Sequence, residues 1–144
     1  MKIRQAEEAD YQKLMSLYNL FVGEDRYSKL DNDSFAKVLK SPNNFIYIAE
    51  ENKQFVGFVS FSVRLVVRYP KPIAELDELY VLPEFRKKGV GKLLMNQIES
   101  KAKELNCYRI FIESHYSHKV AHQFYEKLEY KNYGFHFIKN LGSR

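Results

Sequence analysis

Residues 86–92, Arg-Lys-Lys-Gly-Val-Gly-Lys, lie between an apolar strand pattern at 74–81 and an amphipathic helix pattern at 90–105. The two glycines of this stretch let the backbone approach a ligand closely, and the helix that follows presents unpaired N–H groups and the positive end of its dipole. Its lysines and arginine add positive charge. The stretch therefore predicts a strand, loop and helix that together bind an anion carrying several phosphates.

Two common phosphate motifs do not fit this stretch. A Walker loop needs glycine five residues before Gly91 and Ser or Thr after Lys92, but Arg86 and Leu93 stand there. A Rossmann fingerprint that starts at Gly89 needs a third small residue where Leu94 stands. Both readings are excluded.

Arg-x-x-Gly-x-Gly at 86–91, directly after Val-Leu-Pro-Glu-Phe at 81–85, closely resembles the acetyl-CoA motif of the GNAT N-acetyltransferase superfamily. The segment 121–128, Ala-His-Gln-Phe-Tyr-Glu-Lys-Leu, resembles the second conserved block of that family. The resemblance covers nearly the whole chain. It implies acetyl-CoA as cosubstrate and direct transfer of the acetyl group to a primary amine.

In the family, the loop amides hold the CoA pyrophosphate and the preceding strand holds the pantetheine arm. The residues that the resemblance assigns to acetyl-CoA are Leu79, Tyr80, Val81, Arg86, Lys87, Lys88, Gly89, Val90, Gly91, Lys92, His118, Ala121 and Phe124. Arg86 is expected to act partly as a structural anchor. His118 stands where the family often has asparagine, and Glu129 stands where glycine is usual after the helix. Glu129 should cost about 1 kcal/mol if its backbone is left-handed.

The pattern of turns and periodicities predicts an α/β fold in the order β-α-α-β-β-β-α-β-α-β. The resemblance implies a mixed, largely antiparallel central sheet with helices on both faces. Strands are expected at 3–6, 45–50, 55–67, 73–81, 108–113 and 130–141, and helices near 7–22, 33–39, 90–105 and 118–128. Gly23 should end the first helix, and 23–30 should form a polar, mobile connector.

The strand at 73–81 has an irregular pattern. Ala74 and Leu76 occupy even positions, whereas Leu79 and Val81 occupy odd ones. Because side chains alternate between the two faces, a regular strand could not bury both pairs on one face. An extra residue near 77–78 would restore the phase. The pattern favours a β-bulge whose backbone groups are available to a ligand. A strand buried on both faces and a simple irregularity are the alternatives.

Acetyl transfer needs a base, an acid and a donor for the developing oxyanion. Glu75, Asp77 and Glu78 are the candidate bases, and Glu75 matches the basic glutamate of the histone-modifying branch of the superfamily. Tyr125 is the candidate acid, since its phenol is protonated at neutral pH and the resemblance implies that it points at the CoA sulfur. The backbone N–H groups of 79–81 are the expected oxyanion donors. Ordinary surface carboxylates and a packing tyrosine are the simpler alternatives.

The 144 residues and 45% apolar content fit one domain, 1–144. The apolar runs are far shorter than a membrane span and the N-terminus lacks a signal-peptide core, so a soluble, cytoplasmic protein is expected. Cys107 is the single cysteine and cannot form an internal disulfide. The net charge of +5 suits an anionic cofactor, and no nucleic-acid motif accompanies it.

The acceptor expected from the acidic residues is a small cationic amine, similar to a polyamine or aminosugar. The alternatives are a protein or peptide amine as acceptor, a non-catalytic module that binds acyl-CoA, and a basic nucleic-acid binder that uses the same lysines. A homodimer is left open. No metal is expected, because the histidines at 115, 118 and 122 lack the zincin pattern: Lys119 stands where glutamate is needed.

Overall fold

The computed structural model describes residues 1–25, 27 and 32–142. The chain falls into two compact units, Met1–Ile112 and Glu113–Arg144, which we describe separately. A single domain over the whole chain stays a prediction, and residues 26 and 28–30 of the predicted connector lie outside the described residues. Among the helices of the described part, none is both long and apolar enough to span a membrane.

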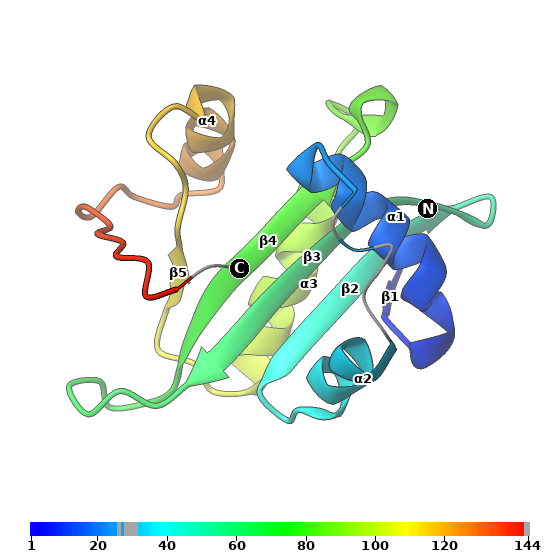
Figure 1. Ribbon diagram of the computed structural model, residues 1–144. Coiled ribbons are helices and arrows are strands. Elements are labelled where there is room, and N and C mark those ends of the chain that lie inside the picture. Colours follow the sequence, from blue (N-terminus) through cyan, green and yellow to red (C-terminus); the bar gives the residue numbers. More distant parts are fainter. Residues whose placement is uncertain (26, 28–31, 143–144) are drawn as a thin grey trace. The chain divides into compact units, whose positions relative to one another are not determined.

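The first unit is built on a five-stranded sheet in the order β1-β2-β3-β4-β5 (Figure 1). Its strands are β1 Lys2–Gln5, β2 Asn44–Glu51, β3 Gln54–Arg64, β4 Ile73–Val81 and β5 Ile110–Ile112. The first four strands pair antiparallel, and β5 joins β4 in parallel. The mixed, largely antiparallel sheet is therefore confirmed. The strand expected at 55–67 ends earlier, because Leu65 and Val67 are exposed and have no ladder to join.

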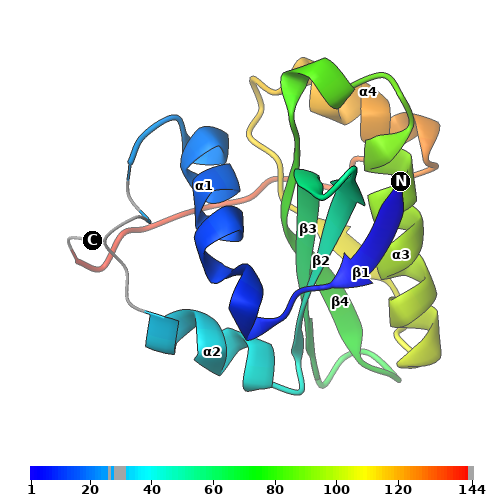
Figure 2. The ribbon, with the colours of Figure 1, turned by 90° about the vertical axis from the view of Figure 1, so that its right-hand side faces the viewer.

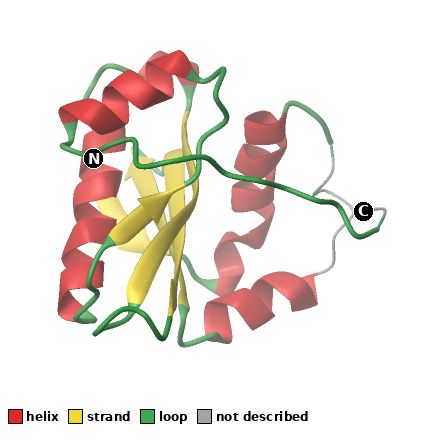
Figure 3. Cartoon of the chain, turned by 90° about the vertical axis from the view of Figure 1, so that its left-hand side faces the viewer, coloured by secondary structure: helices red, strands yellow, loops and turns green. Residues whose placement is uncertain are grey.

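Helices cover both faces of this sheet (Figure 2). The helices α1 Tyr11–Val22, which follows a short 3-10 turn at Glu8–Asp10, and α2 Asn32–Lys40 lie on one face. The helix α3 Val90–Glu104, which follows the 3-10 turn Pro83–Phe85, lies on the other (Figure 3). Each of these helices has the apolar face that its periodicity predicts.

The core fills both sides of β3. On the α1 side, the ring of Tyr18 stacks on Phe58 at a centroid distance of 4.2 Å, beside the fully buried Leu14. On the α3 side, the predicted stripe of that helix is buried from Val90 to Ala102. Because β3 is covered on both faces, its residues alternate between two apolar environments and fix the position of β4 beside it.

The β-bulge in β4 is confirmed. Phe61 of β3 pairs with Leu76 and the preceding Ser60 pairs with Glu78, so Asp77 is the extra residue. Beyond the bulge, Tyr80 faces α1, where its ring lies 5.7 Å from that of Phe21. The bulge thereby places the apolar residues on both sides of Asp77 on the α3 face, as the parity pattern predicted.

The second unit contains the helix α4 Lys119–Lys127. The helix ends in a Schellman motif, in which Tyr130 N–H donates to the carbonyl of Tyr125 and Glu129 N–H donates to that of Glu126. Glu129 has a φ of 68°, so it occupies the left-handed position that usually favours glycine. The predicted penalty at this residue therefore applies.

The strand predicted at 130–141 is wrong. The described residues of this segment form no regular element, and the side chains of Tyr133, Phe135 and Phe137 are about nine-tenths exposed. Alternating apolar residues suit a strand, but a strand also needs a partner with which to form hydrogen bonds. The observed order of elements therefore stops at the last helix.

Candidate active site

The loop between β4 and α3 has the geometry of an anion site. Gly89 is the residue before the helix and has a φ of 85°, and Lys87 has a φ of 60°. The N–H of Leu93 donates to the carbonyl of Gly89 at 3.0 Å. The N–H groups of the first helical turn, residues 90–92, therefore have no acceptor within the helix and point to where an anion would bind.

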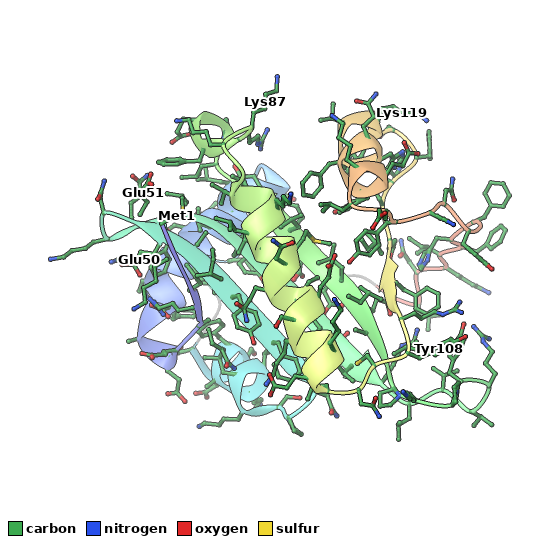
Figure 4. The ribbon with its side chains drawn as sticks, turned by 180° about the vertical axis from the view of Figure 1, so that it is seen from behind. Met1, Glu50, Glu51, Lys87, Tyr108 and Lys119 are labelled. Atoms are coloured by element: carbon green, nitrogen blue, oxygen red, sulfur yellow. The ribbon has the colours of Figure 1, made fainter. Side chains whose placement is uncertain are left out.

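Some side chains of this loop anchor it to the end of β4, whereas others carry exposed positive charge. Arg86 Nε donates to the carbonyl of Val81 at 2.8 Å, and its guanidinium lies over the ring of Tyr80 at 5.6 Å. These contacts fasten the loop to the end of β4 and support the anchoring role expected of Arg86. Lys87 extends from the exposed loop beside the helix N-terminus (Figure 4). Val90 contributes only its backbone, since its side chain is buried in the core.

The edge of β4 next to β5 is open in its second half. The β4–β5 ladder pairs Ala74, Glu75 and Leu76 with β5 and then stops. Within residues 1–112, Leu79, Tyr80 and Val81 therefore pair with β3 but have no partner strand on the β5 side. Apart from the Val81 carbonyl, which accepts from Arg86 Nε, the N–H and C=O groups on this side are suited to an extended ligand that pairs like an added strand.

Three carboxylates lie at the bulge, but their surroundings differ. Glu78 Oε2 accepts hydrogen bonds from Ser60 Oγ and, at 3.2 Å, from the Tyr18 hydroxyl. Asp77 Oδ1 accepts one from Ser62 Oγ at 3.2 Å. Glu75 instead forms an ion pair with Arg64 at 3.3 Å.

Burial and nearby negative charges shift the pKa values of two groups at the bulge. Burial, together with the negative charges of Glu78 and Glu75, raises the pKa of Asp77 from 3.8 to about 6, although the Ser62 hydrogen bond acts in the opposite direction. Burial and the charge of Glu78 raise the pKa of Tyr18 well above its usual value. Tyr18 is thus a hydrogen-bond donor at neutral pH, and Asp77 has a pKa suited to a general base.

A pocket of about 400 Å³ opens onto Asp77 and Glu78. Its walls come from α1, α2, β2 and β3, and six of its apolar lining residues are Tyr11, Met15, Tyr18, Tyr27, Phe35 and Val38. Sequence reasoning did not identify these residues as part of a site. Their spacing on α1 and α2 was visible, but the same spacing is typical of side chains that fill a core.

The remaining predicted residues belong to the second unit. Tyr125 lies on α4, where its ring is 5.5 Å from that of Phe124 and 6.3 Å from that of Tyr130. Burial raises the pKa of its phenol, which keeps the hydroxyl protonated at neutral pH. His118 precedes the first turn of the helix and is exposed, whereas Ala121 and Phe124 are half-buried.

The histidines of this unit contact one another without forming a metal site. His122 Nε2 lies 3.0 Å from the carbonyl of His115, and the rings of His115 and His118 are 5.6 Å apart. Among residues 1–25, 27 and 32–142, no group of three or more His, Cys, Asp or Glu side chains is arranged to hold a metal ion.

Comparison with known proteins matches this chain to acetyltransferases. The model of the acetyltransferase (GNAT) family matches residues 10–130. The aminoalkylphosphonate N-acetyltransferase of Salmonella typhimurium is 30% identical over 109 residues, which are 76% of this chain and 71% of that protein.

Solved structures share the fold. An aminoglycoside acetyltransferase from an uncultured soil metagenomic sample, in complex with trehalose, superposes with a TM-score of 0.87 at 22% identity, over 98% of this chain and 96% of that one. An aminoglycoside N-acetyltransferase in complex with CoA superposes with a TM-score of 0.82 at 17% identity, over 99% and 100%. The glycine-containing loop before α3, the bulged strand and the family match lead to one conclusion: this chain belongs to the GNAT family of acetyl-CoA-dependent N-acetyltransferases.

Proposed function

We propose that this enzyme transfers the acetyl group of acetyl-CoA directly to the primary amine of a small cationic acceptor. The observation that carries the proposal is the bulge, because it places Asp77 and Glu78 in a pocket wall directly before the open backbone edge at 79–81. An amine held by these carboxylates would lie next to a thioester held along that edge. Proximity of this kind is a large part of the catalysis of a two-substrate reaction.

For the cosubstrate, we propose that the N–H groups of residues 90–92 bind the pyrophosphate and that Lys87, Lys88 and Lys92 add charge. The pantetheine arm, which carries amide groups, would pair with Leu79, Tyr80 and Val81. The solved relative with CoA has the same fold. His118, Ala121 and Phe124 remain proposed contacts of the cofactor arm on the basis of the family motif.

The proposed chemistry assigns one role to each group. Asp77 accepts a proton from the acceptor ammonium, and the freed amine forms a bond to the thioester carbonyl carbon. A backbone N–H of Leu79, Tyr80 or Val81 donates to the oxygen that gains charge. The carbon–sulfur bond then breaks, Tyr125 donates its proton to the sulfur, and the second proton of the product nitrogen restores the Tyr125 phenol. The products are the N-acetyl amine, the CoA thiol and one proton.

Asp77 is our choice among the three carboxylates. Glu75 is occupied by Arg64, and Glu78 is held by two hydroxyl donors. Asp77 has a raised pKa and a single hydrogen-bond donor in the described contacts. The Salmonella relative and the metagenomic structure are both named for amine acceptors of small size. This supports a small amine over a protein amine.

The proposal is tested by two measurements on the full chain. Acetyl-CoA should raise the thermal unfolding temperature, because a ligand that binds only the folded state stabilises it. Thiol release should then require both acetyl-CoA and an amine from a mixed panel. Stabilisation without release from any amine, but with acetylation of a peptide library, would replace the small acceptor with a protein amine. Stabilisation with neither would indicate a non-catalytic acyl-CoA-binding module.

A further inference from the structure

The described lining of the pocket beside the bulge carries charge at one position only. Among its described lining residues, Asp77 and Glu78 are the only ones with an ionisable acidic side chain, and none is Lys, Arg or His. These two carboxylates are adjacent in sequence. An acceptor therefore meets negative charge at a single position.

The rest of the described lining is mainly aromatic or aliphatic, and its uncharged polar residues are Ser34, Asn44 and Ser60. The rings of Tyr11 and Phe35 lie 5.6 Å apart where α1 meets α2, and those of Tyr18 and Tyr27 lie 5.4 Å apart. Val38 of α2 adds an aliphatic side chain that is 40% exposed. Such walls favour apolar and aromatic groups, and ring faces also attract a cation that enters past them.

Glu78 is held in place at the charged end. Two hydroxyl groups from different elements, Tyr18 of α1 and Ser60 of β3, donate to the same carboxylate oxygen. This leaves the other oxygen of Glu78 available to an ammonium group. Hydrogen bonds to a carboxylate fix its orientation as well as its charge.

From this arrangement we infer that the acceptor is a primary monoamine with an aromatic or branched apolar body, such as an arylalkylamine. The inference rests on the proposed function and narrows its acceptor. The ammonium group lies between Asp77 and Glu78, and the apolar body lies against Tyr11, Phe35 and Val38.

Other small amines fit these surroundings less well. The second and third ammonium groups of a polyamine would lie against rings, with no further carboxylate among the described lining residues to pair with them. A phosphonate would bring two negative charges into a pocket whose described charges are already negative. The hydroxyls of an aminosugar would have to find partners among Ser34, Asn44 and Ser60. Asn44 already donates to Ser41 and Ser60 to Glu78, and each hydroxyl left unpaired costs about 1–3 kcal/mol.

Binding and turnover test the inference separately. Calorimetry in the presence of CoA, where no transfer occurs, should show 2-phenylethylamine binding at least about tenfold more tightly than spermidine, 2-aminoethylphosphonate or glucosamine. Thiol release from acetyl-CoA should follow the same order. Tighter binding of spermidine, 2-aminoethylphosphonate or glucosamine would overturn the inference, whatever the turnover. Binding of 2-phenylethylamine without thiol release would leave the pocket assignment standing and overturn the proposed transfer.

A charge variant tests the position of the apolar body. Val38→Lys should weaken 2-phenylethylamine binding about tenfold and improve the relative affinity for 2-aminoethylphosphonate, since it adds a cation to the apolar wall. Leu20→Lys is the matched control, because Leu20 is an exposed apolar residue of α1 outside the pocket lining. Equal effects of the two variants on 2-phenylethylamine binding would show that the apolar body does not lie against α2.

Discussion

Ser62 Oγ donates a hydrogen bond to Asp77 Oδ1 at 3.2 Å, next to the position where β4 has one residue more than β3. The bond links the extra residue to the neighbouring strand. It also opposes the rise in the Asp77 pKa that burial and the two nearby glutamates cause. The carboxylate therefore titrates near pH 6, within reach of ordinary assays.

Asp77→Asn is expected to remove one ionisation step from the pH dependence of kcat/KM. In the unaltered enzyme kcat/KM should rise with pH through about 6, because the base must be ionised to accept a proton. The variant should lack this rise with pH. Its kcat should be about 10²- to 10⁴-fold lower, which is the usual contribution of a general base. Glu75→Gln is the control, and its kcat/KM should still rise with pH through about 6. If kcat/KM of Asp77→Asn rises in the same way, another group is the base.

The same variant should change how stability depends on pH. The folded protein holds the Asp77 proton more tightly than the unfolded chain does, so the stability that this group contributes is present below pH 4 and is lost as pH rises to about 6. Urea unfolding at several pH values should show this decline in the unaltered protein and a smaller decline in Asp77→Asn.

Tyr18→Phe should weaken acceptor binding and leave acetyl-CoA binding intact. The substitution removes one of the two hydroxyl donors to Glu78 but keeps the ring that stacks on Phe58. A hydrogen bond to a charged group is worth about 1.5–3 kcal/mol, so KM for the amine should rise about tenfold or more. Ser16→Ala is the matched control, since the Ser16 hydroxyl donates to a helix carbonyl on the exposed side of α1. An unchanged KM would mean that Tyr18 does not position Glu78.

Tyr125→Phe should lower kcat and leave acetyl-CoA affinity nearly unchanged. The phenol is protonated at neutral pH and burial raises its pKa further, so the variant loses a proton donor without losing the ring. A change confined to the chemical step would appear in single-turnover kinetics. Full activity across the pH range would contradict the assignment of Tyr125 as the acid.

Gly57→Ala should destabilise the fold. A Cβ at Gly57 would lie 2.7 Å from the carbonyl oxygen of Tyr80, which belongs to the backbone and cannot turn aside as a side chain could. Overpacking of this kind costs about 1–3 kcal/mol and would shift the strand edge proposed for pantetheine. Urea unfolding should show the loss, and calorimetry should show weaker acetyl-CoA binding. Gly134→Ala serves as the control, because nothing lies within 4 Å of its added Cβ.

Glu129→Gly should stabilise the helix end. Glu129 has a φ of 68°, where glycine avoids the strain of a side chain, so a gain of about 1 kcal/mol is expected. Glu129→Ala removes the same charge but keeps the strain, and it should give no comparable gain. Equal gains from the two variants in thermal unfolding would attribute the effect to charge instead of backbone conformation.

The parts of this fold that were predictable are those set by local chemistry. The glycines at 89 and 91 and the helix periodicity predicted a loop followed by a helix from residue 90, and the parity change between Leu76 and Leu79 predicted the bulge. The family resemblance, and not the residue pattern alone, selected acetyl-CoA.

The parts that were not predictable depend on which segments meet. Sequence could not separate Glu75 from Asp77, because the pairing of Glu75 with Arg64 arises from the β3–β4 register. It also could not show that Tyr11 and Phe35, which are 24 positions apart, share one pocket wall. At 130–141 an alternating pattern was mistaken for a strand because the pattern carries no information about a partner.

Because Asp77 is an extra residue in β4, the number of residues in this strand is more constrained than their types. A substitution there keeps Leu76 opposite Phe61 and Glu78 opposite Ser60. Deletion of Asp77 would keep both halves of the strand in register with β3 but would close the bulge, so that the carboxylate and its hydrogen bond with Ser62 would be lost. Related sequences should therefore vary in residue type along this strand while keeping the same number of residues between Ile73 and Val81.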